Sequence, residues 1–188
     1  MTAPEKTWFK RYADFAAKLR VPCGFVLVAT FAFFSRPTGA ALALGLPLSL
    51  IGLALRGWAS GHLEKNRQLT VSGPYAFLRN PLYIGTLLVA FGLVIAGSRW
   101  LLAAVFAAVF LLVYLPVIEL EEQHLRALFP EFREYARRVP ALFPTFHPES
   151  TGKEFRWSLY RYNREYEALA GFAVGAIFLF AKMLLAPG

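Results

Sequence analysis

The chain has 188 residues, of which 57% are hydrophobic and only 17% charged, and its formal net charge is +8 at pH 7. A soluble domain has about 25% charged residues, and a chain this short cannot bury so much apolar surface in one core. The composition excludes a soluble globular domain and, with 16% aromatic residues, a disordered chain. The single cysteine, Cys23, excludes an internal disulfide framework and a cysteine-rich zinc site.

Residues 1–20 combine a regular aromatic pattern with many charges. Trp8, Tyr12, Phe15 and Leu19 recur at helical spacing, with lysine and arginine between them. Such a pattern favours a helix that lies on a membrane surface. A loose charged tail is the alternative interpretation.

Five apolar segments follow. They are residues 21–34, 39–55, 81–97, 100–118 and 168–186. About 20 residues cross a bilayer and 17 are tolerated, so whether the first segment crosses fully is left open. Short polar links at residues 35–38 and 98–99 predict two tight hairpins.

The expected fold is therefore all-α: a polytopic membrane helix bundle of about five transmembrane helices, with an N-terminal interfacial helix and helical segments at the cytoplasmic face. We expect three parts along the chain. These are an interfacial helix at 1–20, a membrane core at 21–145, and an interfacial segment with the last transmembrane helix at 146–188.

The charges predict an orientation. With five spans, seventeen of the twenty basic residues and all twelve acidic residues fall on one side of the membrane. Arg36, Arg99 and Lys182 fall on the other side. The positive-inside rule then predicts a protein of the inner (cytoplasmic) membrane, with a cytoplasmic N-terminus and an external C-terminus. Membrane topology explains the net charge, so no nucleic-acid partner is expected.

Small residues within the apolar segments are typical of closely packed membrane helices. The glycines expected at helix contacts are Gly24, Gly45, Gly52, Gly85, Gly92, Gly97, Gly171 and Gly175. Gly171 and Gly175 form a GxxxG pattern, which is compatible with a homo-oligomer.

A first polar motif, residues 69–83, lies at the start of the third apolar segment. Pro81 fits the first turn of a helix, where its missing N–H costs nothing. Arg79, Asn80 and backbone N–H groups would then meet at a helix N-terminus, which attracts an anion such as a carboxylate. A boundary arginine beside a capping asparagine explains the same residues equally well.

A second polar motif follows the fourth apolar segment. Glu119, Glu121 and Glu122 lie close together there, so they require cationic or hydroxyl-rich partners. A solvated helix face, with Glu122 paired to Arg126, is the alternative. Glu121-x-x-His124 matches half of a di-iron pattern, but no second copy exists and no metal site is predicted.

Together the two motifs resemble a known family. Three successive patterns carry the resemblance. They are Gly73-Pro74-Tyr75-x-x-x-Arg79-Asn80-Pro81-x-Tyr83, then Glu121-Glu122-x-x-Leu125-x-x-x-Phe129, and then Tyr135-x-x-Arg138-Val139-Pro140. In these patterns the sequence is similar to the integral-membrane methyltransferases. This group contains the isoprenylcysteine carboxyl methyltransferases and the phospholipid N-methyltransferases. The resemblance covers roughly residues 50–145.

The resemblance implies S-adenosylmethionine as cofactor at the cytoplasmic face and a lipophilic acceptor that comes from the bilayer. Membrane lipids are the other expected partners. The cofactor-binding residues that it implies are Gln68, Leu69, Thr70, Tyr75, Asn80, Pro81, Leu82, Tyr83 and Glu121. Glu122 is the candidate catalytic base, for an acceptor that must lose a proton.

Three positions differ from the family pattern. Asn80 replaces a histidine, Val117 replaces an arginine of the prenylcysteine-specific members, and Ala141 replaces an arginine after the Val-Pro pair. The acceptor is therefore open among a carboxylate, an amine and another lipid head group. Two alternative functions remain open: a membrane reductase that uses a nicotinamide dinucleotide, and a non-enzymatic membrane adaptor that uses the basic segment 153–164.

Overall fold

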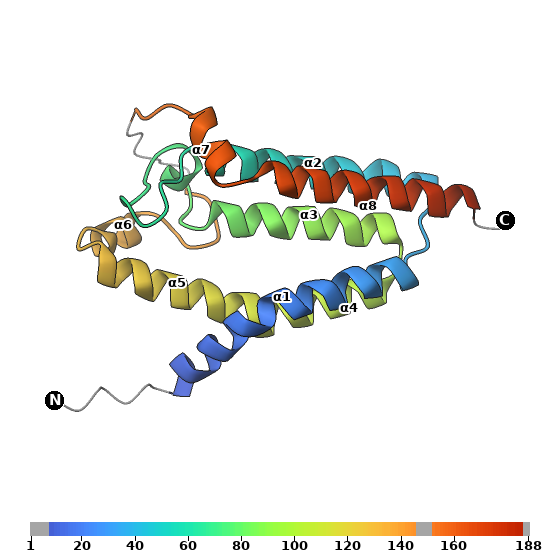
Figure 1. Ribbon diagram of the computed structural model, residues 1–188, viewed down its shortest axis with the longest axis horizontal. Coiled ribbons are helices and arrows are strands. Elements are labelled where there is room, and N and C mark those ends of the chain that lie inside the picture. The colour runs from blue at the N-terminus through green and yellow to red at the C-terminus, as the bar shows by residue number, and fades with distance from the viewer. Residues whose placement is uncertain (1–7, 146–151, 186–188) are drawn as a thin grey trace.

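The computed structural model describes residues 8–145 and 152–185, and the described residues form a polytopic bundle of helices (Figure 1). The α-helices are α1 (Trp8–Phe34), α2 (Gly39–Ser60), α3 (Pro81–Gly97), α4 (Trp100–Val109), α5 (Leu115–Leu128), α6 (Phe132–Arg138), α7 (Trp157–Tyr162) and α8 (Tyr166–Leu185). A 3-10 helix, η1 (Gly73–Ala76), precedes α3, and a π-helical turn, η2 (Phe110–Tyr114), joins α4 to α5.

Four helical segments are long and apolar enough to cross a membrane. They are Trp8–Phe34, Gly39–Ser60, Trp100–Leu128 and Tyr166–Leu185, and α3 is a shorter apolar helix beside them. The expected helix bundle is thus confirmed, and α3 has the predicted bounds. Pro81 opens α3, and Ser98 ends it in the left-handed region at φ 51°. The orientation in the membrane stays a prediction.

Helix α1 runs without interruption through residue 20, where the sequence pattern predicted a boundary between an interfacial helix and the first span. Pro22 lies inside the helix and does not end it. A proline removes one helical hydrogen bond, which membrane helices commonly tolerate. Residues 1–7 lie outside the described part of the chain. Residues 146–151 also lie outside it, so the structure does not describe the predicted division between residues 145 and 146.

The fourth apolar segment is also longer than predicted, because α4, η2 and α5 form one continuous helical run to Leu128. Pro116 has no N–H, so the carbonyl of Leu112 loses the partner four residues later that a regular helix would give it. The phenol of Tyr12 on α1 donates a hydrogen bond of 2.6 Å to that carbonyl. This contact fixes the first helix against the fourth predicted span.

Helices α2 and α3 pack so closely that their contact requires glycine. A Cβ added at Gly45 would come within 2.3 Å of the carbonyl oxygen of Gly92, and one at Gly52 within 2.6 Å of that of Gly85. Between these pairs, the Ser49 hydroxyl donates to the Val89 carbonyl at 2.9 Å.

Gly97 also lies in a tight contact, where a Cβ would meet the side chain of Leu102 at 2.6 Å. The expectation of close packing within the chain is wrong for Gly24, Gly171 and Gly175, where an added Cβ would meet none of the described residues within 4 Å. A small residue permits a close approach, but it does not require one.

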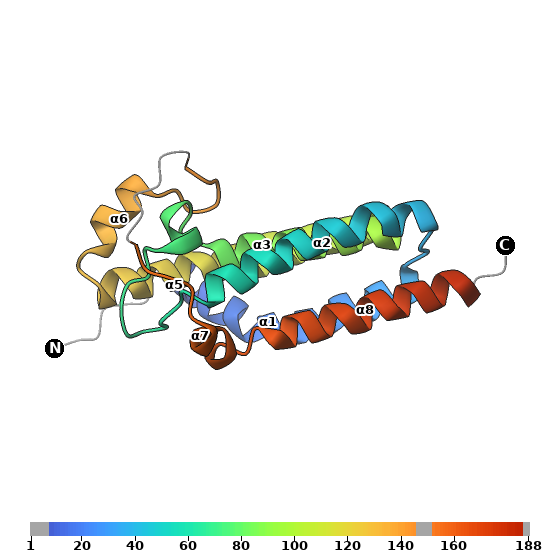
Figure 2. The same ribbon diagram turned by 90° about the horizontal axis from the view of Figure 1, so that it is seen from above.

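The two ends of the bundle differ. One end, which we call the loop-rich end, carries residues 61–80, 129–145 and 152–165, with η1, α6 and α7 (Figures 1 and 2). The other end holds the tight links 35–38 and 98–99, joined by a hydrogen bond of 2.8 Å from the Arg36 N–H to the Gly97 carbonyl. Here the Lys182 ammonium donates to the carbonyl of Ala32 at 2.6 Å, at the C-terminal end of α1.

Candidate functional site

A cavity of about 810 Å³ opens at the loop-rich end, between α1, the end of α2, the start of α3 and α5. Its volume is typical of a small-molecule site. All ten residues singled out from the sequence line it: Gln68, Leu69, Thr70, Tyr75, Asn80, Pro81, Leu82, Tyr83, Glu121 and Glu122. Two motifs that lie about 40 residues apart therefore contribute to one concave surface.

The centre of this wall is an ion pair between α5 and Arg79, two residues before α3. Arg79 donates to both carboxylate oxygens of Glu122, from Nε and from Nη2, at 3.0 Å each. The Asn80 amide donates to the same carboxylate at 3.0 Å, and Arg126 donates at 3.2 Å. The side chain of Glu122 is only 5% exposed.

This network identifies the anion that the first motif attracts. The sequence left open whether Arg79 and Asn80 bind an external anion or merely border a span. In the structure the anion is the chain's own Glu122. Asn80 precedes α3 without capping it through its side chain, which donates instead to Glu122 and to the Ala141 carbonyl. With three donors on its carboxylate, Glu122 is held in place, and this arrangement favours a positioning role over that of a general base.

Glu121, its neighbour, is in a different environment. Its side chain is 49% exposed, and its carboxylate lies 3.9 Å from the guanidinium of Arg20 on α1. It also lines the cavity, where an accessible carboxylate accepts hydrogen bonds from a ligand's hydroxyl or ammonium groups. The two adjacent glutamates thus differ in burial and in their free hydrogen-bonding capacity.

Two buried tyrosines join η1 to α6. The phenol of Tyr135 donates to the backbone carbonyl of Tyr75 at 2.7 Å. Burial raises the pKa of both phenols above the ordinary value, so each stays a neutral hydrogen-bond donor. Tyr135 belongs to a hydrophobic cluster with Phe132, on which Leu69 packs. This packing positions the segment that carries the predicted residues 68–70.

The same segment is held from its other side by residues that precede α8. Lys153 donates to the Gln68 amide oxygen at 3.0 Å, and the Gln68 amide nitrogen donates to Glu64. Arg156 forms an ion pair with Glu64, and its backbone N–H donates to the Gly61 carbonyl at 2.9 Å. These contacts connect the cavity wall to the last membrane helix.

His62 lies beside the residues that precede η1. It is buried, and its Nδ1 lies 3.1 Å from the Ser72 hydroxyl. Its ring occupies the space beside Gly73, whose φ of +57° and lack of a Cβ make room for it. Burial, and then the charge of Arg156, lower the pKa of His62. His62 does not line the cavity.

A family model matches the part of the chain that carries both polar motifs. Residues 39–131 match the family model of the phospholipid methyltransferases. Over about half of its length the chain is thus similar to the phospholipid methyltransferase family. The matched region contains all ten of the predicted site residues and both residues of the Arg79–Glu122 pair.

Two curated relatives are similar over part of their length. The chain is 40% identical over 132 residues to a protein of Cupriavidus metallidurans named cobalt-zinc-cadmium resistance protein CzcN, covering 66% of this chain and 61% of that one. It is 38% identical over 113 residues to nickel-cobalt-cadmium resistance protein NccN of Alcaligenes xylosoxydans xylosoxydans, covering 57% and 52%. The chain thus spans somewhat over half the length of these relatives. No solved structure matches it.

Part of the cavity wall lies outside the phospholipid methyltransferase match. Arg20, Val21, Gly24, Phe25 and Val28 of α1 line the cavity, and all but Arg20 present an apolar or small surface. The sequence did not predict them as site residues, because residues 1–20 were interpreted as a surface helix and residues 21–34 as the first apolar segment. Their spacing along one helix face was the available signal.

A second missed feature is Arg56, near the end of α2. It lines the cavity and donates to both oxygens of Glu165, at 2.6 and 3.0 Å, and to the Thr86 hydroxyl. Glu165, directly before α8, is buried and lies outside the family match. The signal for Arg56 was an arginine placed near the end of an otherwise apolar helix. In the described residues, no group of three or more His, Cys, Asp and Glu is placed to hold a metal ion.

Proposed function

We propose that this protein is a membrane methyltransferase that uses S-adenosylmethionine and acts in the 810 Å³ cavity on a lipophilic acceptor from the bilayer. One observation carries the proposal: two distant motifs of a phospholipid methyltransferase sequence line one cavity, which is polar near residues 68–80 and apolar along α1.

The residues of the cavity fit this cofactor. The N-terminus of α3, a helix of 17 residues, suits the carboxylate of the methionyl group through the helix dipole. The half-exposed carboxylate of Glu121 suits its ammonium group or its ribose hydroxyls. The rings of Tyr83 and Tyr114, whose centroids lie 6.4 Å apart, suit a cationic sulfur.

When bound, the cofactor supplies a methyl group on a positively charged sulfur. The contribution of this chain is to hold the acceptor in line with that methyl group and to exclude water. We assign Glu122 to positioning, in place of its earlier role as candidate base: it fixes Arg79 and Asn80, and through them the start of α3. An acceptor that reacts as an anion needs no base at all.

The acceptor would occupy the part of the cavity along Val21, Gly24, Phe25 and Val28. Apolar side chains there favour an acyl or prenyl chain over a soluble substrate. Val117, where prenylcysteine-specific relatives have an arginine, is buried and does not line the cavity. A carboxylate, an amine or another lipid head group all fit this arrangement.

Calorimetry on the purified full chain tests the proposal. We expect S-adenosylhomocysteine to bind, and Glu121→Ala to weaken this binding by about tenfold, as for the loss of one hydrogen bond to a charged group. Glu119→Ala, two residues away on the same helix and not on the cavity wall, should bind like the wild type. A folded wild-type chain that does not bind the ligand, and is stabilised instead by a reduced nicotinamide dinucleotide, would contradict the proposal.

A further inference from the structure

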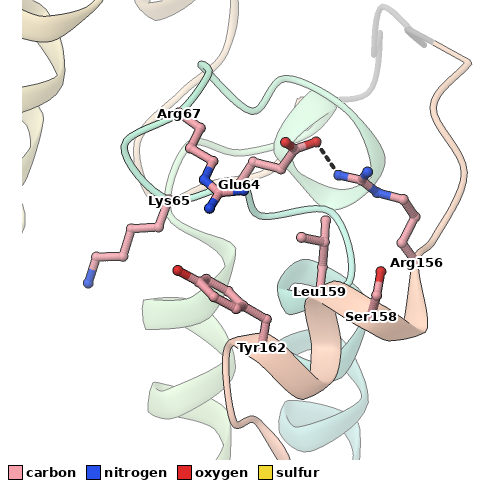
Figure 3. A pocket seen from close by; sticks show the side chains of 7 residues that line it. All are labelled: Glu64, Lys65, Arg67, Arg156, Ser158, Leu159 and Tyr162. Atoms are coloured by element: carbon pink, nitrogen blue, oxygen red, sulfur yellow. Dashed lines mark hydrogen bonds and ion pairs between the residues drawn. The ribbon is translucent and has the colours of Figure 1, made fainter.

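A second, smaller cavity of about 260 Å³ lies at the loop-rich end, between the residues that follow α2 and helix α7 (Figure 3). Seven residues line it: Glu64, Lys65, Arg67, Arg156, Ser158, Leu159 and Tyr162. Glu64 and Lys65 also line the larger cavity, so the two cavities adjoin, whereas the other five residues line only the smaller one.

Positive charge dominates this cavity. Glu64 forms an ion pair with Arg156, which leaves Lys65 and Arg67 without a carboxylate partner among the described residues. The guanidinium of Arg67 lies 5.8 Å from the centroid of the Tyr162 ring, and Figure 3 shows the two side chains turned toward each other. Figure 3 shows the Lys65 side chain extended outward from the hollow, and its flexible stem allows the ammonium group to reach a ligand bound there. The guanidinium of Arg67, this second cation and the nearby hydroxyl groups suit the oxygens of a phosphate group.

The depth of the cavity indicates where such a phosphate would come from. Its residues directly follow the end of α2 at Ser60 and precede the start of α8 at Tyr166. The Asn163 amide donates to the Ser60 carbonyl at 2.9 Å, so the two helix ends lie at one level. The hollow therefore lies just beyond the apolar part of two spans, where lipid head groups are found.

Aromatic side chains mark the same level. Trp157 and Tyr162 of α7 are 68% and 67% exposed, on a short helix whose described residues are not buried. Tryptophan and tyrosine in such positions are typical of the boundary between hydrocarbon and head groups. A soluble phosphorylated ligand would not account for this exposed aromatic surface.

We propose that this cavity binds the phosphate of an anionic phospholipid from the surrounding leaflet, with Lys65 and Arg67 as its cationic ligands. The charge of the cavity and its depth carry the assignment, which is independent of the methyltransferase proposal. Lys153 and Arg156 also hold Gln68 and Glu64, so the lipid would bind beside the loop that forms the wall of the larger cavity.

Native mass spectrometry of the purified full chain tests this site, with phosphatidylglycerol and phosphatidylcholine of identical acyl chains as probes. We expect the wild type to retain phosphatidylglycerol preferentially. The double variant Lys65→Gln/Arg67→Gln should lose this preference by about fivefold for each cation removed. The control Arg133→Gln/Arg137→Gln removes the same charge from exposed positions at the same end and should keep the preference.

If the double variant unfolds at a lower temperature than the wild type, the lipid preference is measured on the single variant Arg67→Gln instead, because Arg67 lies at an exposed loop position. Equal losses in the cavity and control variants would overturn the site in favour of general surface charge. Equal retention of both lipids by the wild type would overturn it as well. Displacement of the lipid by millimolar inorganic phosphate would identify a soluble anion site and overturn the membrane assignment.

Discussion

Arg79 and Glu122 bind each other through two hydrogen bonds of 3.0 Å, although they lie 43 positions apart in the chain, with α3, α4 and η2 between them. The pair joins the start of α3 to α5 and is largely closed to solvent. Removing one partner of such a pair leaves an uncompensated charge, which costs much more than the pair contributes.

We therefore expect Glu122→Gln to lower the free energy of unfolding by about 3 kcal/mol, since Arg79 and Arg126 then face a neutral amide. Thermal unfolding of the purified protein in detergent measures this loss. Glu119→Gln is the matched control: its side chain is 43% exposed, and we expect a change below about 1 kcal/mol.

The same variant separates positioning from base catalysis. A positioning residue changes stability and cofactor affinity but leaves the shape of the pH–rate profile as it was. Loss of the acidic limb of that profile in a folded Glu122→Gln protein would restore Glu122 as the base.

The contact between α2 and α3 allows a second prediction. Gly45→Ala places a methyl group against the backbone of α3, so we expect a loss of about 1–3 kcal/mol in unfolding free energy. Gly171→Ala, at an open position in the middle of α8, should leave stability unchanged or raise it slightly. Equal behaviour of the two variants in thermal unfolding would contradict the packing described for α2 and α3.

His62 predicts a dependence of stability on pH. Its pKa is lowered in the folded protein, so below the ordinary value of about 6.5 the unfolded chain binds a proton more readily than the folded one. The contribution of neutral His62 is complete above that value and is lost as the pH falls toward the lowered pKa. We expect the melting temperature of the wild type to fall between about pH 7 and pH 5. His62→Gln keeps a hydrogen-bonding group for Ser72 and should show a smaller fall over the same range.

The charge distribution predicts which end of the bundle is cytoplasmic. In a Cys23→Ser background, Gly39→Cys and Ala127→Cys place exposed thiols at opposite ends of the bundle. A maleimide that does not cross the inner membrane should label Gly39→Cys in intact cells and Ala127→Cys only after the cells are opened. The reverse labelling would invert the proposed orientation and place the cavity outside.

Local signals predicted the parts of this fold that local chemistry determines. Pro81 and the Ser98–Arg99 link mark both ends of α3, and the two motifs identified a set of residues that lie together in one cavity. No local pattern could assign Glu122 as the partner of Arg79, because the pairing depends on how α3 and α5 are placed. For the same reason Arg56 and Glu165 were counted only as charges beside a membrane.

The continuity of α1 was missed for a different reason. Its first half carries charges on one face and its second half is apolar all round, so hydropathy changes at residue 20 while the backbone does not. The glycines of α8 illustrate the converse case: the GxxxG spacing of Gly171 and Gly175 is real, but no helix of the described chain packs against it.

The hydrogen bond between Tyr12 and Leu112 also bears on how the protein is made. Helix α1 packs mainly on α4, η2 and α5, whereas α2 and α3 form a hairpin of consecutive segments. During synthesis both helices of the hairpin are present as soon as residue 97 has entered the membrane, so α2 and α3 can pack on each other at once. The first helix has no partner for the Tyr12 hydrogen bond until some eighty more residues have been made, so the cavity between α1 and α5 cannot form before the fourth span is in the membrane.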